Sequence, residues 1–299
     1  MRQPGGSAAT PSSGAPVGRS IRVHVLRSGS AGNAVLIAAG ETRLLVDAGL
    51  PVEVIGRELA PLALELRDLT AVLLTHEHDD HARSAGALAR LGIPVLGNAR
   101  TLLHASAALA GAEGDTFTTG VPFRVGEFLV ESFAIPHDAV EPVGFLFQVD
   151  GVTVLLAHDL GDVDGALRER LPRADLVVLE ANYDPRLLGV SGYPWFLKNR
   201  ILSPVGHLSN DGAAGAAVWA ARGGRPQTVH LVHLSEANNL PPLARDTVRW
   251  ALEREGIGTT RVAAVRPNTP GPLWEMPLGV RLEQDPFRQD APRRDAPVS

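Results

Sequence analysis

The chain has 299 residues and a formal net charge of −5 at pH 7. It contains no cysteine, which excludes disulfide bonds and thiolate metal sites. A mildly acidic chain has no general attraction to nucleic acid, so any phosphate contact must come from local clusters of basic residues. The chain also lacks an uninterrupted run of about eighteen apolar residues, so no transmembrane helix is expected.

Both ends of the chain have the composition of solvated segments. Residues 1–20 are rich in Gly, Ser, Pro and Ala and lack the apolar centre of a signal peptide, which predicts a disordered arm and a cytoplasmic protein. Residues 276–299 are rich in Pro, Arg and Asp, which predicts a disordered tail. One folded domain is therefore expected over residues 21–275.

Short apolar runs separated by Gly-containing turns open this domain and predict strands at residues 21–25, 34–38 and 42–46. Helices and strands then alternate, with helices predicted at 52–66, 80–91 and 101–109 and strands at 71–74 and 93–96. Residues 123–156 read mostly as strand, with a hairpin turn at Asp150-Gly151. The second half predicts strands at 176–179, 228–231 and 261–265 and helices at 210–221 and 240–255. This order predicts an α/β sandwich of two mixed sheets with helices on the outer faces.

The segment Thr75-His76-Glu77-His78-Asp79-Asp80-His81 is the most informative feature of the chain. It holds three of the ten histidines and directly follows the apolar run 71–74, which reads as a buried strand. His76 and His78 are two residues apart and can point the same way, and Asp80 and His81 follow one turn later. Histidine and carboxylate without cysteine favour zinc, manganese or iron.

Three further residues occupy the same kind of position, directly after an apolar run. They are His137, Asp159 and His233. Together with the histidine cluster they form a coherent set of ligands for two metal ions. His158 and His230 lie within the runs themselves, and strand alternation predicts that they turn away and serve structural roles.

The cluster THEHDDH, preceded by LLVDAG with Asp47, resembles the signature of the metallo-β-lactamase fold superfamily. Within that superfamily the segments SGSAGN, PHDAVEPVGF, HDLG, LEANYD, GHLSND and HLSEANN resemble the YycJ/WalJ-like exonuclease group, which is similar in motif order to tRNase Z. The resemblance covers residues 21–270 and implies a metallo-hydrolase with an αββα sandwich.

Carried onto this chain, the resemblance assigns the first metal to His76, His78 and His137. It assigns the second metal to Asp80, His81 and His233, with Asp159 bridging both. Asp47 would steady the cluster loop from behind, although a plain turn aspartate is an equal alternative. His207 matches a histidine near the scissile phosphate in the nuclease branches and is the alternative to His233 as the last ligand, with His233 preferred for its cleaner strand end.

Two metals a few ångströms apart would yield a bridging hydroxide as nucleophile and neutralise charge on a phosphate. Asp80 is the candidate proton acceptor and His207 the candidate proton donor. Two segments are candidates for substrate binding. The SGSAGN loop offers Ser30 and Asn33 for a phosphate but is equally an ordinary turn, and the segment 195–210 offers Lys198, Arg200 and Ser209 but equally suits an amphipathic helix followed by a helix cap.

These observations lead to the hypothesis of a two-metal phosphodiesterase that hydrolyses nucleic acid, with a DNA exonuclease favoured by the resemblance. Zinc is the preferred metal, with Mn²⁺ or Fe²⁺ as alternatives. A hydrolase of a small phosphodiester or cyclic nucleotide keeps the same metal centre, and a non-catalytic metal-bound regulatory protein is a third reading. The complete set of ligands argues against the third.

Overall fold

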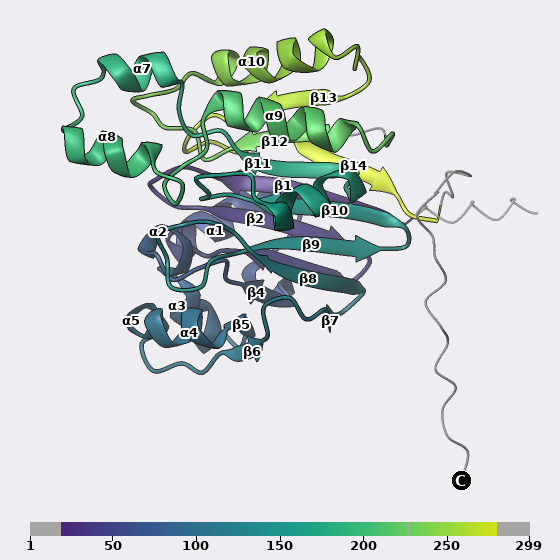
Figure 1. Cartoon of the computed structure of the whole chain (residues 1–299). Coiled ribbons are helices and arrows are strands. Elements are labelled where there is room, and N and C mark those ends of the chain that lie inside the picture. The colour runs from purple at the N-terminus through teal and green to yellow at the C-terminus, as the bar shows by residue number, and fades with distance from the viewer. Residues whose placement is uncertain (1–18, 226–227, 280–299) are drawn as a thin grey trace, which may run out of the picture.

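The computed structural model describes residues 19–225 and 228–279. The elements form a four-layer sandwich in which two seven-stranded sheets pack face to face and helices cover their outer faces (Figure 1). The predicted fold class is therefore confirmed. Among the described helices, none combines the length and the apolar character needed to cross a bilayer.

The first sheet has the strand order β14-β1-β2-β3-β4-β5-β6. Its strands are β1 (Ser20–Arg27), β2 (Ala34–Ala39), β3 (Thr42–Val46), β4 (Ala71–Leu73), β5 (Val95–Asn98), β6 (Asp115–Phe117) and β14 (Leu273–Pro277). β1, β2 and β3 form an antiparallel meander, whereas β3, β4, β5 and β6 run parallel.

The second sheet has the order β13-β12-β11-β10-β9-β8-β7. Its strands are β7 (Phe123–Val125), β8 (Phe128–Ala134), β9 (Val143–Val149), β10 (Val152–Ala157), β11 (Leu176–Glu180), β12 (Thr228–Val232) and β13 (Arg261–Ala264). β10, β11, β12 and β13 are parallel. The predicted hairpin joins β9 to β10, and Asp150 and Gly151 both have positive φ (46° and 84°), as a tight type I′ turn requires.

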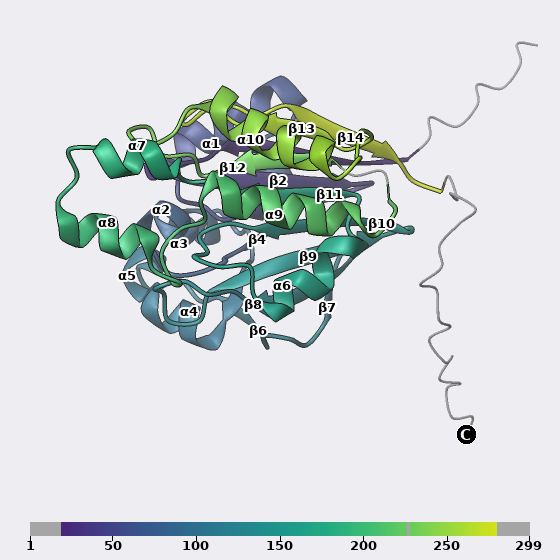
Figure 2. The ribbon, with the colours of Figure 1, turned by 45° about the horizontal axis from the view of Figure 1, so that its top comes forward.

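The helices fall into two sets on the outer faces. One set is α1 (Val52–Leu59), α2 (Asp79–Ala82), α3 (Ala85–Arg90), α4 (Ala99–His104) and α5 (Ser106–Leu109). The other is α6 (Gly165–Arg170), α7 (Pro185–Val190), α8 (Trp195–Leu202), α9 (Asn210–Ala221) and α10 (Pro241–Arg254), with short 3₁₀ turns at Ala60–Leu62, Leu66–Asp68 and Leu171–Arg173. Turning the molecule shows that α9 and α10 lie along the second sheet, whereas α7 and α8 extend beyond the strands at one end (Figure 2).

Two of the predicted helices are interrupted, one by a turn within its own segment and one by contacts with a loop distant in sequence. The helix predicted at 52–66 ends at Leu59, where Pro61 lies in a 3₁₀ turn that Ala63 closes with a left-handed φ of 57°. The helix predicted at 80–91 is split into α2 and α3 at Ser84, whose N–H and hydroxyl bind the carbonyls of Ala48 and Leu50 at 2.8 and 2.6 Å. The second break fastens the start of α3 to the loop that follows β3.

The predicted boundaries of the folded domain shift slightly. β1 already begins at Ser20, and β14, which was not predicted, pairs antiparallel with β1 and reaches Pro277. The rest of the two predicted disordered segments, residues 1–18 and 280–299, lies outside the described residues.

The core comprises a layer between the sheets and one layer beneath each set of helices. Apolar side chains that alternate along the strands fill the layer between the sheets, with Phe128, Phe145 and Phe147 at its centre. Val232 of β12 faces this layer, so His230, two residues earlier, lies on the same face, 3% exposed. Its ring nitrogen Nδ1 has no hydrogen-bond partner within the described part of the chain.

His230 generates a prediction about pH and stability. Burial, helped by the nearby His24, lowers the pKa of His230 to about 4, so the folded protein holds it neutral. The unfolded chain binds this proton near pH 6.5, so stability present above pH 6.5 is lost as the pH falls towards 4. Between pH 7.5 and 5, His230→Leu should lose less unfolding free energy than the wild type, by up to about 2 kcal/mol.

Urea unfolding of both proteins at the two pH values, with excess chelator, measures this difference. His104→Leu, at the exposed end of α4, is the matched control and should behave as the wild type does. An equal loss of stability in His230→Leu and wild type would contradict the assignment.

Candidate metal centre

The candidate site lies where strands of both sheets end. Asp47 follows β3, the histidine cluster follows β4, and His137 follows β8. Asp159 and His233 follow β10 and β12 of the second sheet. Because the parallel strands of one sheet share a carboxyl edge, the topology brings these residues to one end of the sandwich.

The first group of ligand atoms belongs to His76, His78 and His137, whose candidate atoms all lie within 4.8 Å of one another. Nε2 of His76 lies 3.1 Å from Nδ1 of His78, so both rings point to one place. His137 Nδ1 lies 3.2 Å from the carbonyl oxygen of Gly206, and a hydrogen bond there leaves Nε2 with its lone pair free for a metal. The structure thus brings the three predicted ligands of the first metal together.

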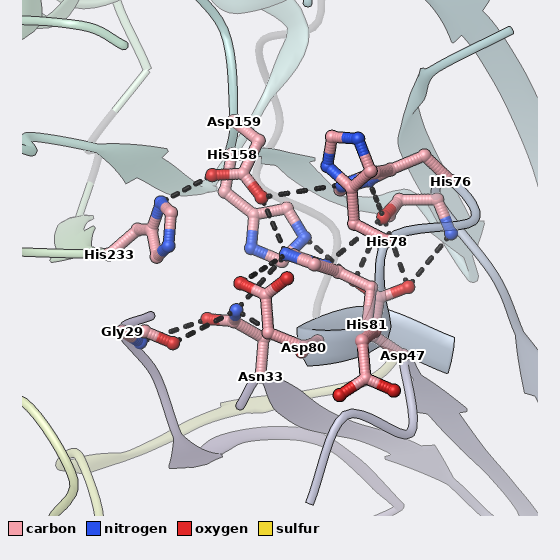
Figure 3. Close-up of polar contacts among 12 residues, drawn as sticks. Gly29, Asn33, Asp47, His76, His78, Asp80, His81, His158, Asp159 and His233 are labelled. Atoms are coloured by element: carbon pink, nitrogen blue, oxygen red, sulfur yellow. Dashed lines mark hydrogen bonds and ion pairs between the residues drawn. The ribbon is translucent and has the colours of Figure 1, made fainter. Parts of the chain in front are cut away.

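The second group comprises Asp80, His81, Asp159 and His233, again within 4.8 Å. Asp159 Oδ2 lies 2.5 Å from His81 Nε2 and 3.7 Å from His76 Nε2, so it faces both groups. Asp159 Oδ1 contacts His233 Nδ1. Figure 3 shows Asp159 between His233 and His76. This central place is where the resemblance put a bridging ligand.

Asp47 holds the second group from behind. It is fully buried, and its Oδ2 accepts hydrogen bonds from His81 Nδ1 at 2.8 Å and from His158 Nε2 at 2.9 Å (Figure 3). Both of its oxygens also bind the hydroxyl of Thr75. Burial alone would raise the pKa of Asp47, but the charges and hydrogen bonds of His81 and His158 bring it down to about 2. His158 therefore belongs to the support of the site and not only to the packing.

Sequence reasoning missed Glu180, the last residue of β11. Glu180 is fully buried, and its Oε1 lies 2.8 Å from Nδ1 of His207 and 2.9 Å from Nδ1 of His233. Its Oε2 accepts from the backbone N–H of Leu160 at 2.8 Å. The rule that found the other residues, a polar side chain at the end of an apolar run, also applies to Glu180 after Leu179.

His207 lies between α8 and α9, and its side chain is 22% exposed, whereas that of His233 is 4% exposed. Burial would lower its pKa, but the charge and the hydrogen bond of Glu180 raise it. His207 groups with Asp159, Glu180 and His233, whereas His233 also groups with Asp80 and His81. This grouping favours His233 over His207 as the last ligand of the second metal.

Three residues of the site have backbone conformations that side chains usually avoid. Asp47, Asp159 and His233 have φ of 63°, 53° and 55°. A left-handed conformation costs a non-glycine residue about 1–2 kcal/mol. The surrounding contacts must hold these residues in place, as the bond of 2.9 Å from Asp47 N to Leu73 O does.

The donor set fits divalent metal ions. Asp159, His76 and His81 are between 0% and 2% exposed, and isolated charges buried so deeply are costly. Nε2 of His233 is buried without a hydrogen-bond partner among the described residues. Imidazole and carboxylate donors of this kind suit zinc, manganese and iron.

The predicted substrate contacts in the SGSAGN loop have different environments. Ser30 is exposed, but Asn33 is fully buried. The side-chain oxygen of Asn33 accepts from Ser28 Oγ at 2.9 Å and Gly29 N at 3.0 Å, and its Nδ2 lies 3.1 Å from His81 Nε2. Asn33 therefore organises the loop against the site, whereas the exposed Ser30 stays a candidate contact for a substrate.

The contacts predicted in the second segment also have protein partners. Lys198 Nζ donates to the carbonyl of Gly189 at 2.8 Å, and Arg200 Nε donates to Asp138 Oδ2 at 2.6 Å. Ser209 is the N-cap of α9 and accepts from Gly212 N at 3.0 Å. Of these three residues, Arg200 is the one whose partner lies next to a candidate metal ligand, because Asp138 directly follows His137.

Comparisons with known proteins find relatives that match most of this chain. Exodeoxyribonuclease YycJ of Bacillus anthracis is 34% identical over 254 residues, which cover 84% of this chain and 96% of that protein. Exodeoxyribonuclease WalJ of Streptococcus pneumoniae is 36% identical over 264 residues, which cover 85% and 98%. Among solved structures, the metallo-β-lactamase fold protein YhfI of Bacillus subtilis matches with a TM-score of 0.66 at 21% identity, covering 86% and 100%. The short form of human tRNase Z matches with a TM-score of 0.56 at 18% identity, covering 83% and 98%.

The profile described as "Beta-lactamase superfamily domain" matches residues 42–234, from β3 to just beyond His233. The matched region contains the histidine cluster and every other candidate metal ligand. The predicted family and the predicted enzyme class, a metal-dependent hydrolase, are thereby confirmed. The chain belongs to the metallo-β-lactamase superfamily.

Proposed function

We propose that this protein is a two-metal phosphodiesterase that hydrolyses nucleic acid, with DNA exonuclease as the favoured activity. The observation that carries the proposal is the pair of ligand groups that meet at Asp159, with the His207–Glu180 pair beside them. The two relatives named as exodeoxyribonucleases match over nearly their whole length, which supports a substrate of the same kind. The cytoplasm remains the proposed location and zinc the proposed metal.

The metal-holding residues would be His76, His78 and His137 for one ion and Asp80, His81 and His233 for the other, with Asp159 shared. Two divalent ions held there would supply activated water and would neutralise charge on the phosphate. The proton transfers of the reaction are assigned to side chains of the protein.

Asp80 is suited to accept a proton. Its side chain is 27% exposed, in contrast to the deeply buried Asp159. Burial would raise the pKa of Asp80, but the hydrogen bond and the charge of His81 lower it, so the carboxylate stays ionised near neutral pH. An accessible carboxylate can orient an attacking water and take its proton.

His207 is suited to donate a proton to the leaving oxygen of the phosphodiester. Glu180 binds Nδ1 of His207, so Nε2 is the ring nitrogen available to substrate. Because Glu180 raises the pKa of His207, the ring carries its extra proton closer to neutral pH than an isolated buried histidine would. The hydrogen bond from the backbone N–H of Leu160 holds the Glu180 carboxylate in the position from which it raises this pKa.

The first prediction from the proposed function concerns the ligands and the proton acceptor. Asp80→Ala should lower kcat/KM on 5′- or 3′-labelled DNA by about 10²–10⁴-fold, because it removes both a metal ligand and the acceptor. His76→Ala should abolish detectable hydrolysis, whereas His104→Ala, at the exposed end of α4, serves as the control with wild-type activity. Unchanged degradation by Asp80→Ala protein would refute the proposal. Rapid turnover of bis(p-nitrophenyl) phosphate with no attack on DNA or RNA would favour a small phosphodiester instead.

The second prediction concerns the support behind the metals. Asp47→Asn should weaken metal affinity by about 10–100-fold, because the amide replaces an anion that binds both His81 and His158. Competition with a chromophoric chelator measures the affinity directly, without any substrate. Asp79→Asn is the matched control, since Asp79 belongs to the same cluster but is 73% exposed and pairs with Arg83. Equal affinities of the Asp47 and Asp79 variants would show that Asp47 has no such role.

The third prediction concerns the acid. Glu180→Gln should move the alkaline limb of the kcat profile to lower pH, because Glu180 is what raises the pKa of His207. The profile is measured at saturating metal, since Glu180 also binds His233. An alkaline limb at the wild-type position would mean that His207 is not the proton donor.

A further inference from the structure

The helix α8 presents aromatic side chains to solvent. Trp195 and Phe196 are 74% and 75% exposed, whereas the other described phenylalanines are buried or half-buried. The inner side of α8 packs through Leu197 and the buried Ile201 against Tyr183 and its neighbours. The exposed aromatic residues therefore contribute nothing to the core and require another explanation.

The segment that carries these aromatic residues has a net positive charge, with Arg200 paired to Asp138 from outside the segment. Residues 184–206 contain Arg186, Lys198 and Arg200, and Asp184 is the single acidic residue among them. Asp184 is occupied as the N-cap of α7, where it accepts from two backbone N–H groups. A basic segment with exposed aromatic rings in a chain of net charge −5 suits a polyanion that has flat, apolar parts.

This segment is continuous with the metal centre. Arg200 Nε binds Asp138 Oδ2 at 2.6 Å, and Asp138 Oδ1 lies 3.3 Å from His137 Nε2. The carbonyl of Gly206, just after α8, lies 3.2 Å from Nδ1 of the same histidine. Figures 1 and 2 both show α7 and α8 extending beyond the strands at the end of the molecule where α2, with Asp80 and His81, also lies.

The spacing along α8 suits successive nucleotides. Phe196 and Arg200 are four residues apart and share one side of the helix, with Trp195 next to Phe196 at its outer end. Trp195 and Arg200 are separated by about 7.5 Å along the axis, roughly twice the 3.4 Å rise of a stacked nucleotide. A strand that leaves the metal centre past Arg200 reaches the aromatic rings within a few nucleotides.

We propose that the exposed side of α8 is a base-stacking platform that binds a single-stranded segment of the nucleic acid substrate through Trp195 and Phe196. The platform rests on the proposed nuclease function and specifies its substrate class. Bases inside a duplex are covered on both faces by their neighbours and cannot stack on these rings, so the platform takes unpaired bases or the base at the end of a strand. A second copy of the chain fits this surface less well, because its basic residues would then face one another.

The test compares Trp195→Ala/Phe196→Ala with Trp250→Ala, which removes a tryptophan that is 61% exposed on α10. Both substituted side chains of the double variant are mostly exposed, so little packing is lost. The double variant should bind a phosphorothioate oligothymidylate at least tenfold more weakly than wild type, whereas Trp250→Ala should bind it as wild type does. Trp195→Phe/Phe196→Tyr should restore binding, since it restores the flat rings.

Activity gives a second reading. In the double variant the ratio of kcat/KM on a single-stranded oligonucleotide to kcat/KM on bis(p-nitrophenyl) phosphate should fall about tenfold or more. Equal oligonucleotide affinity and an equal ratio in wild type and double variant would overturn the platform while leaving the nuclease function intact.

The failure of the proposed function has a different signature. Wild-type protein would then leave DNA and RNA intact while hydrolysing the small ester. Sedimentation of the wild type and of the double variant tests whether a second copy of the chain binds this surface instead. A dimer that becomes a monomer on substitution, with unchanged oligonucleotide affinity, would identify the surface as an interface between copies and would overturn the proposal.

Discussion

The whole site depends on a buried row of side chains in which carboxylates and imidazoles alternate. Asp47 binds His81, His81 faces Asp159, Asp159 contacts His233, and His233 binds Glu180. Each of these groups is almost fully removed from water, so none would be stable in its charged form without the next. Burial alone would lower the pKa of His233, but Asp159 and then Glu180 raise it to about 10. This row of buried groups thus holds the rings of His81 and His233 in place.

Asparagine side chains hold this row of groups in place. Their contacts give a physical role to the segments that resemble the exonuclease group. In LEANYD, Asn182 Nδ2 donates to the carbonyl of His233 at 2.8 Å. In HLSEANN and GHLSND, the side chains of Asn239 and Asn210 bind each other at 2.8 and 3.0 Å. Asn239 also donates to Ala181 O at 2.8 Å. These segments therefore join the loops that carry Glu180, His207 and His233, and a change in one loop would displace the others.

Much of the fold and of the site could be predicted because the signals are local. Apolar runs predicted most strands within a few residues, and the side chains that follow them predicted His137, Asp159 and His233. What the sequence could not indicate depends on tertiary contacts. β14 forms because β1 leaves an unpaired edge, and Ser84 divides a helix because Ala48 and Leu50 lie next to it. Glu180 satisfies the same local rule as the other residues, but its place in the site depends on His207 and His233, whose positions beside it the sequence does not indicate.

The metal centre and the exposed side of α8 have different physical constraints. The residues proposed to carry out the reaction are therefore distinct from those proposed to select the substrate. At the metal centre, buried charges and strained backbones leave few side chains free to change, since each contacts two or more others. The proposed two-metal centre would act on the phosphodiester itself, so it offers little discrimination among the groups attached to that phosphate. The exposed side of α8 has the opposite character, because Trp195 and Phe196 make no contact that the core requires. Selection among substrates is therefore expected to depend on α7 and α8, which can vary without disturbing the ligands, while Arg200 and Gly206 keep that region aligned with His137.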